Sequence, residues 1–310
     1  MQLLRGDLSG FEGETVLTIG KYDGLHVAHQ SLIRHIRERA ARLGARSGMV
    51  TFDPHPAAVL SPSGPPPLLT TIPEKIALLE GMGLDVLVLL PFTRETMQTR
   101  AADYLEFLAS GLHPRELWVG EDFALGYKRE GNVTFIRQWA EPRGIEVFTI
   151  PLVEVNGEVV SGSRVRALLD EGAVEEAARL LGRLPSVTGL VVEGDKRGRT
   201  IGFPTANLIP DPGRAIPANG VYATRALLAD GEAVPSVTNV GTRPTFEGSR
   251  RQVETHLLDW SGDLYGQEIT VQFLHRLREE RKFAGIEALV AQIRVDAEQA
   301  RALLVPSASG

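Results

Sequence analysis

Residues 18–30 read TIGKYDGLHVAHQ, and this stretch decides how the first half of the chain can fold. The short apolar run 16–19 is typical of a buried strand, and apolar residues recur over 30–43 with the spacing of one helix face. Gly20 and Gly24 lie between the two patterns and allow the backbone to turn tightly and to approach a ligand. The sequence therefore predicts a strand, a glycine-containing turn and a helix, in that order.

The same alternation continues to about residue 182. Further strands are predicted at 48–52, 84–90, 116–119 and 145–150, and further helices at 73–81, 94–108 and 133–141. The run 84–90 is continuously apolar, as expected for a parallel strand that is buried on both faces. Strands that alternate with helices indicate βαβ units, so we expect an α/β domain with a doubly wound, Rossmann-like parallel sheet.

After about residue 183 the pattern changes to consecutive strands. They are predicted at 187–193, 221–229, 234–239, 253–258 and 269–273, and 285–304 is helical. Turn signals such as Asp230-Gly231 separate them, as in β-hairpins. This predicts a small antiparallel β-barrel with a C-terminal helix. We therefore expect two domains, 1–183 and 184–310, and expect residues 184–310 to fold alone.

Composition restricts the classes of function. Of 310 residues, 43% are hydrophobic and 23% are charged, as in ordinary globular proteins. The net charge of −6 argues against nucleic acid as a partner, because such binding relies on Lys and Arg that neutralise phosphates. The chain has no cysteine, which excludes disulfides and Cys-type metal sites. Since no apolar run reaches the ~20 residues of a membrane span or forms a signal peptide core, we expect a cytoplasmic protein that does not enter a membrane.

His26 and His29 lie three residues apart, between the first predicted strand and helix. Ligands of parallel α/β sheets bind beyond the carboxyl ends of the strands, and a helix N-terminus there favours phosphate. That helix end contributes only about 0.3–1 kcal/mol, so the imidazoles are expected as additional donors to a transferring phosphoryl group. A zinc pair is the alternative, but His-Glu-x-x-His is absent and no third ligand is evident. Structural histidines are a further alternative.

Residues 18–30 resemble the nucleotidyltransferase signature G-x-F-D-G-x-H-x-G-H of bacterial bifunctional riboflavin kinase/FAD synthetases. Other segments of that family follow in order: TFDPHP (51–56), WVGEDFALG (118–126), SGSRVR (161–166), GLVVEGDKRGRTIGFPTANL (189–208), NGVYA (219–223), NVGTRPTF (239–246) and VETH (253–256). The resemblance spans nearly the whole chain. It implies that the second half phosphorylates riboflavin to FMN, and that the first half adenylylates FMN to FAD with release of pyrophosphate. ATP and Mg²⁺ would serve both reactions, without zinc.

For the first half, the resemblance implies that His26 and His29 stabilise the ATP phosphates. His55 is suggested for flavin, and the nucleotide or its phosphates are assigned to Gly20, Gly24, Asp122, Ser163 and Arg166. Asp122 can equally cap the following turn, and Asp23 is expected to organise the loop rather than to act as a base. Ser163 is also expected to cap a helix that runs to residue 171, which would fix Arg166 as a cation for pyrophosphate.

In the second half, residues 194–200 (GDKRGRT) do not form a P-loop, because three residues rather than four separate the glycines and Arg199 replaces the required Lys. The backbone N–H groups of a glycine-containing turn can still bind phosphates. Nucleotide binding is therefore predicted for Gly194, Lys196 and Gly198.

The segment GFPTAN provides oxygen ligands, the hydroxyl of Thr205 and the amide oxygen of Asn207. Mg²⁺ prefers few protein ligands of this kind, with phosphates and waters completing its octahedron. The resemblance assigns Thr205 and Asn207 to Mg²⁺, Glu254 to the base that deprotonates the riboflavin ribityl hydroxyl, and Arg278 to the flavin site. A carboxylate in that role needs hydrogen-bond reach and a suitable pKa.

Two other functions remain open at this point. Ala28 replaces the usual Gly between the histidines and Gly162 replaces a hydroxyl residue, so the chain could be a riboflavin kinase whose adenylylation is weakened. This hypothesis requires residue 28 to adopt a positive φ or to lie close to ATP. A non-catalytic flavin- or nucleotide-binding regulator is the other alternative, although a binding protein would not need the base Glu254. A monomer or a weak homo-oligomer is expected.

Overall fold

The computed structural model describes residues 1–310 except 63, 152, 195–196, 212, 246–247 and 305–310, with side chains also left undescribed at 197, 199, 243–245 and 248–250. The chain divides into two compact units, Met1–Gly162 and Ser163–Gly310. Within the described residues, no helix combines the length and the apolarity that a membrane crossing requires.

The first unit contains a six-stranded parallel sheet in the order β1-β4-β3-β2-β5-β8. The strands are β1 (Gln2–Arg5), β2 (Thr15–Ile19), β3 (Arg46–Asp53), β4 (Val86–Pro91), β5 (Pro114–Gly120) and β8 (Glu146–Ile150). The order from β4 to β8 is that of a doubly wound sheet whose strand order reverses between β2 and β5. The predicted α/β architecture is confirmed. The edge strand β1, which extends the sheet beyond β4, was not predicted.

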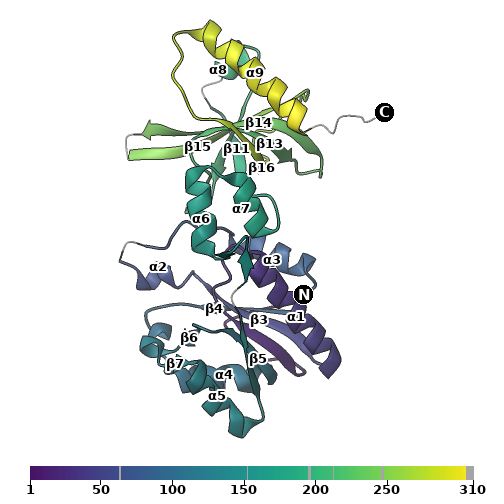
Figure 1. The fold of residues 1–310 in the computed structure, drawn as a ribbon, viewed down its shortest axis with the longest axis vertical. Coiled ribbons are helices and arrows are strands. Elements are labelled where there is room, and N and C mark those ends of the chain that lie inside the picture. Colours follow the sequence, from purple (N-terminus) through teal and green to yellow (C-terminus); the bar gives the residue numbers. More distant parts are fainter. Residues whose placement is uncertain (63, 152, 195–196, 212, 246–247, 305–310) are drawn as a thin grey trace. The chain divides into compact units, whose positions relative to one another are not determined.

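Helices cover both faces of this sheet (Figure 1). On one face, α1 (Val27–Leu43) and α3 (Ile72–Gly81) pack Ile33, Ile36 and Leu79 against the strands. On the other, α4 (Ala101–Leu112) and α5 (Val133–Ala140) contribute Leu105 and Ile136. The remaining elements of this unit are short: α2 (Ala57–Leu60), η1 (Thr96–Gln98), β6 (Ala124–Leu125), η2 (Tyr127–Arg129), β7 (Gly131–Asn132), η3 (Glu141–Arg143), β9 (Glu154–Val155) and β10 (Glu158–Val159).

One predicted helix, 94–108, is wrong in its boundaries. A 3-10 turn occupies Thr96–Gln98, and α4 begins only at Ala101. The carboxylate of Glu130, thirty positions along the chain, accepts hydrogen bonds from the Ala101 N–H at 2.8 Å and from Arg100 Nε at 2.7 Å. This tertiary contact caps the helix at Ala101, and the local pattern contains no sign of it.

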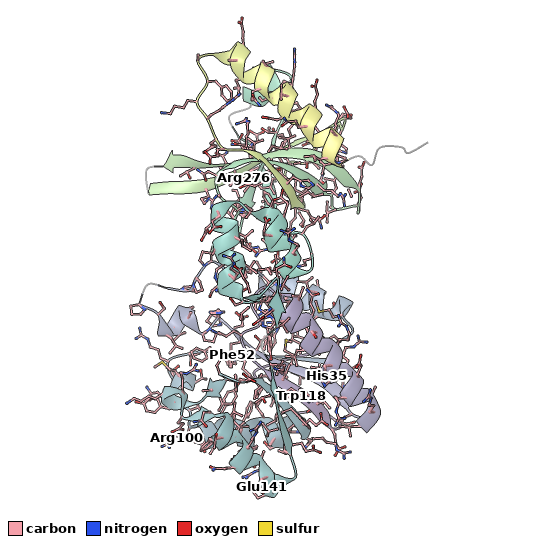
Figure 2. The ribbon with its side chains drawn as sticks, in the orientation of Figure 1. His35, Phe52, Arg100, Trp118, Glu141 and Arg276 are labelled. Atoms are coloured by element: carbon pink, nitrogen blue, oxygen red, sulfur yellow. The ribbon has the colours of Figure 1, made fainter. Side chains whose placement is uncertain are left out.

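Arg39 on α1 has a partner on the sheet. Its guanidinium pairs with the buried carboxylate of Glu116 on β5. Trp118 Nε1 donates to the same carboxylate at 2.8 Å, and His35 packs edge-on against the Trp118 ring (Figure 2). Burial opposes ionisation of Glu116, but the hydrogen bonds from Arg39 and Trp118 keep the pKa of this carboxyl below its usual value.

The second unit is built on a closed antiparallel barrel in the strand order β11-β12-β15-β14-β13-β16. Its strands are β11 (Ser186–Val192), β12 (Ala206–Pro210), β13 (Gly220–Leu227), β14 (Ala233–Thr245), β15 (Gly248–Leu257) and β16 (Glu268–Arg278). The fully buried hydroxyl of Thr224 bonds to those of Ser236 and Thr238, at 2.9 and 2.7 Å. The helix α9 (Ile286–Leu304) packs on β13 and β14 through Ala297 and Ala300. The predicted barrel with a C-terminal helix is confirmed.

Two helices that the domain prediction assigned to the first half fall in the second compact unit. These are α6 (Gly162–Glu171), of which all but the first residue belongs to this unit, and α7 (Val174–Leu181). Arg276 on β16 donates to the backbone oxygen of Glu171 at 3.0 Å and lies beside these helices (Figure 2). Ala218 N donates to Leu169 O at 2.7 Å. The short helix α8 (Arg197–Thr200) also belongs to this unit.

These contacts change what we expect of isolated fragments. Residues 163–310 should melt at a higher temperature than residues 184–310, because the shorter fragment lacks α6 and α7 and leaves Arg276 and the Ala218 N–H without these partners. Thermal unfolding of both fragments by circular dichroism, with riboflavin kinase activity as the second measurement, tests this. Equal melting temperatures would show that the barrel does not depend on the helix pair and would favour the boundary at 183/184.

Candidate active sites

The turn after β2 has the backbone that the glycines predicted. Gly24 has φ 81°, and its neighbours Tyr22 and Leu25 also have positive φ, at 48° and 42°. The Tyr22 ring packs directly on Gly20, where an added Cβ would lie 2.9 Å from Tyr22 Cζ. The Tyr22 hydroxyl pairs with that of Thr18, which donates to Trp118 O at 2.7 Å. This turn therefore lies at the carboxyl end of β2, beside β5, where doubly wound sheets bind ligands.

A segment from another part of the chain holds this turn. The buried carboxylate of Asp23 accepts hydrogen bonds from Leu69 N at 3.0 Å and Thr70 N at 3.2 Å, and Gly24 N donates to Thr70 Oγ1 at 3.1 Å. A few residues later, Lys75 Nζ donates to Lys21 O at 3.0 Å. We call residues 69–75 the clamp. Asp23 therefore organises the loop, as expected. The contacts of the clamp with the turn were not predicted.

His26 and His29 form a stacked pair at the start of α1. Their ring centroids are 3.7 Å apart at an interplanar angle of 19°, and Tyr22 contacts the His29 ring edge-on at 5.0 Å. The helix begins at Val27, earlier than predicted, so His26 is its N-cap residue and His29 lies in the first turn. Burial, helped by the charges of His26 and Lys75, holds the pKa of His29 well below its usual value. His29 is therefore a neutral imidazole at neutral pH.

Two further predicted residues follow neighbouring strands of the same sheet. His55 comes just after β3, where its Nδ1 accepts from Ala57 N at 3.2 Å and the proton is assigned to Nε2. Asp122 follows β5 with an exposed carboxylate, while its backbone oxygen accepts from Arg129 Nη2 at 2.9 Å. Because β3, β2 and β5 are parallel neighbours, their carboxyl ends meet at one edge of the sheet. His55 and Asp122 therefore share that edge with the histidine pair.

Ser163 and Arg166 belong to the other compact unit. Both lie on α6 in the second compact unit, so their contribution to phosphate binding stays a prediction. Ser163 is not a cap, because α6 already begins at Gly162 and Ser163 lies inside its first turn. Its side chain is exposed, whereas that of Arg166 is half-buried.

Ala28 lies in the first turn of α1 with a right-handed helical backbone, so its φ is not positive. Backbone strain at residue 28 is therefore not a reason to expect weakened adenylylation. We expect Ala28→Gly to lower the free energy of unfolding of the first unit by about 0.5–1 kcal/mol, because Gly loses more backbone entropy in a helix. The kcat/KM for FMN adenylylation should change less than about twofold. Urea unfolding and steady-state kinetics measure both; a gain above about fivefold would mean that the Cβ obstructs the substrate.

In the second unit, strand register gathers the predicted kinase residues. Glu254 on β15 lies directly opposite Asn207 on β12 and, on its other side, Asn239 on β14. Residues that are opposite on antiparallel strands have Cβ atoms about 4.5–5.5 Å apart on the same face. Glu254 therefore lies between two carboxamides. Asn239 was not predicted as a site residue.

The neighbours of Glu254 on the same face of β15 hold the GFPTAN segment. Gln252 Nε2 donates to Asn207 Oδ1 at 2.8 Å, and His256 Nδ1 lies 2.8 Å from Pro204 O. The His256 ring also contacts Phe203 edge-on at 5.4 Å. These contacts place Thr205 between two anchored residues. Neither Gln252 nor His256 was predicted to have a role.

The glycine-containing turn folds back over this segment. An added Cβ on Gly194 would lie 2.4 Å from Asn207 Nδ2, and one on Gly198 would lie 2.3 Å from Phe203 O. Both glycines are therefore required for the close approach of the turn to the segment. The predicted nucleotide contact of Lys196 lies outside the described residues.

The donor set of this cluster fits Mg²⁺. Thr205 supplies a hydroxyl and Asn207 an amide oxygen, which keeps a second lone pair besides the one that Gln252 occupies. Within the described residues, no group of three or more His, Cys, Asp or Glu side chains could hold a metal ion. The metal would therefore take most of its ligands from the nucleotide phosphates and from water.

Arg278 has a partner that the sequence did not reveal. Its Nε and Nη2 donate to the carboxylate of Asp296 on α9, at 3.0 and 2.8 Å, and Nη1 donates to Glu279 O at 3.0 Å. Asp296 is 1% exposed, and Gln292 donates to it as well. The guanidinium thus fastens α9 to the end of β16. Flavin contact by Arg278 stays a prediction.

Comparison with known proteins agrees with this division. The family model for FAD synthetase matches residues 9–164, and that for riboflavin kinase matches residues 181–304. Bifunctional riboflavin kinase/FMN adenylyltransferases from Pseudomonas fluorescens and Haemophilus influenzae are 38% and 35% identical over 312 and 305 residues. The alignments cover 99% and 97% of this chain and 99% of each relative.

A solved structure shows the same fold across nearly the whole chain. It is described as a macrolide-efflux protein from Streptococcus pneumoniae and matches with a TM-score of 0.89 at 28% sequence identity. The match covers 97% of this chain and 99% of that one.

A parallel-sheet unit matched by the FAD synthetase model, joined to a barrel matched by the riboflavin kinase model, defines a transferase with two active sites. The chain belongs to the family of bifunctional riboflavin kinases/FMN adenylyltransferases. It phosphorylates riboflavin to FMN and adenylylates FMN to FAD, with ATP as the co-substrate.

Proposed function

We propose that each reaction uses the cluster of its own unit. The observation that carries this proposal is the separation of the two sets of residues: the histidine pair and its turn belong to Met1–Gly162, whereas Glu254, Thr205 and Asn207 belong to Ser163–Gly310. We retain 183/184 as the functional boundary of the two catalytic domains.

In riboflavin phosphorylation, Glu254 is the base that removes the proton from the ribityl hydroxyl. Its position directly opposite Asn207 and Asn239 supports this role, because it puts the carboxylate on the same face of the barrel as the proposed Mg²⁺ ligand Asn207, where a bound hydroxyl can reach it. Thr205 and Asn207 would hold Mg²⁺, which would neutralise charge on the ATP phosphates. Gly194, Lys196 and Gly198 bind the phosphates.

In adenylylation, the turn with Gly20 and Gly24 binds the ATP phosphates. The histidine pair donates hydrogen bonds to the oxygens of the α-phosphate, which is transferred. The neutral state of His29 supports a role as hydrogen-bond donor rather than as a fixed cation. His55 contacts flavin and Asp122 the nucleotide. Ser163 and Arg166 are the exception to this separation: they lie on α6, in the second compact unit but before the functional boundary at 183/184, and are proposed to bind pyrophosphate. Because ATP is the co-substrate of both reactions, we infer that the protein works in the cytoplasm. We propose that it is a monomer or a weak homo-oligomer.

The direct test is to incubate the purified chain with riboflavin and ATP, with and without Mg²⁺, and to separate FMN from FAD by chromatography. We expect both products with Mg²⁺ and a large loss of FMN formation without it. FMN formation that does not depend on a divalent cation would contradict the roles of Thr205 and Asn207.

A further inference from the structure

Lys75 is a buried cation with neutral hydrogen-bond partners. Its side chain lies on the core-facing side of α3, on the same face as Leu79, and the residue is 5% exposed. Its ammonium donates to Lys21 O at 3.0 Å and reaches Thr51 Oγ1 at 3.5 Å. Lysine is almost never fully buried unless it is paired with a charge. The position therefore departs from ordinary core packing.

The surroundings of Lys75 compensate only partly for the burial of its charge. Asp23 attracts it at longer range, but the Asp23 carboxylate already accepts hydrogen bonds from Leu69 N and Thr70 N. Asp53 attracts it as well and is exposed to solvent. Burial lowers the pKa of Lys75 to about 8, so the ammonium remains mostly charged at neutral pH. A methionine here would fill similar volume without this cost.

The charge lies under the turn that precedes the histidine pair. Lys21 O, which accepts from Lys75, also accepts from Thr51 Oγ1 at 2.9 Å and lies in the same turn as Gly20 and Gly24. The positive charge of Lys75 also reaches His29, whose pKa it helps to lower. The Lys75 ammonium thus donates to a backbone carbonyl of the turn and lowers the pKa of the His29 imidazole.

We propose that Lys75 serves FMN adenylylation through its charge: the buried ammonium, held at the base of the turn by Lys21 O, attracts the ATP phosphates and offsets the negative charge that gathers there. This inference rests on the proposed binding of the phosphates at this turn. A charge in a poorly solvated site acts more strongly than in water, and no reorganisation is needed when the phosphates arrive. The same ammonium leaves the kinase reaction of the other unit unaffected.

The test compares four variants in the full-length protein. Lys75→Met removes the charge and the donor, and we expect kcat/KM for ATP in FAD formation to fall about 100-fold, in the range found when a preorganised donor is removed. The KM for FMN should stay within about twofold, and riboflavin kinase activity should be retained. Lys128→Met, which removes an exposed lysine of the same unit, should lose less than about twofold. If Lys75→Met does not fold, Lys75→Gln takes its place with the same expected losses.

Thr51→Val separates the charge of Lys75 from the anchoring of the turn. It removes the hydroxyl bonded to Lys21 O and the 3.5 Å contact of that hydroxyl with the ammonium, but it keeps the positive charge and its 3.0 Å hydrogen bond to Lys21 O. We expect it to lose less than about fivefold. An equal loss in Thr51→Val and Lys75→Met, or a loss below about threefold in Lys75→Met, would overturn the proposal. If histidine-pair variants lose FAD formation while Lys75→Met does not, the inference about Lys75 fails and the assignment of the turn stands. If neither loses it, the assignment of the turn fails as well.

Discussion

Glu254→Gln is expected to reduce FMN formation from riboflavin by about 10²–10⁴-fold, the usual contribution of a general base. Glutamine keeps the size of the side chain and a hydrogen-bonding oxygen between Asn207 and Asn239, but it cannot take a proton. FAD formation from supplied FMN should stay within about twofold, because that reaction belongs to the other unit. Separate assays for FMN from riboflavin and for FAD from FMN measure both effects.

Glu268→Gln is the matched control for this variant. Glu268 is an exposed carboxylate on β16 of the same barrel, and its replacement should leave both rates within about twofold. Riboflavin binding, followed by flavin fluorescence, should be nearly the same in Glu254→Gln and in the unmodified protein. Kinase activity that survives in Glu254→Gln would remove this residue as the base.

The second large effect is expected for His29→Ala, with a fall in FAD formation of about 10²–10³-fold, as for the loss of one preorganised donor to a charged transition state. His26→Ala should lose a similar factor, since the two rings are stacked at 3.7 Å and each positions the other. The double variant should lose less than the product of the two factors, because groups that act as a unit are not additive.

His35→Ala on the same helix is the control for the histidine variants. The His35 ring packs against Trp118 at 4.5 Å, and the residue is exposed to solvent. Its loss should change FAD formation less than about twofold. Steady-state kinetics with FMN and ATP, with the kinase rate of the same preparation as an internal reference, measures these effects. An equal loss in His35→Ala and His29→Ala would indicate a general effect on α1 rather than on phosphate binding.

Local patterns were sufficient for much of the fold. The period of apolar residues correctly identified β2, α1, α3 and β4 and the change from alternating to consecutive strands, because these signals depend on neighbours within a few positions. The prediction failed where the boundary of an element depends on residues far away in the sequence. The start of α4 depends on Glu130. The strands β14, β15 and β16 extend beyond their predicted ends because of their pairing in the closed barrel, in which β14 pairs with β15 and β16 pairs with β11 and β13.

The residue types proposed for both sites were visible in the sequence, and so was the resemblance to the family, because its motifs are short stretches of consecutive residues that follow one another along the chain. What the tertiary structure alone decided is how these residues are supported. Asp23 meets Thr70 from 47 positions away, and Glu254 meets Asn207 from 47 positions away. Such contacts depend on strand register and helix packing, which local periodicity does not specify. Lys75 shows this most clearly: in sequence it is one lysine in an amphipathic helix, and packing against β3 and the turn makes it a buried charge.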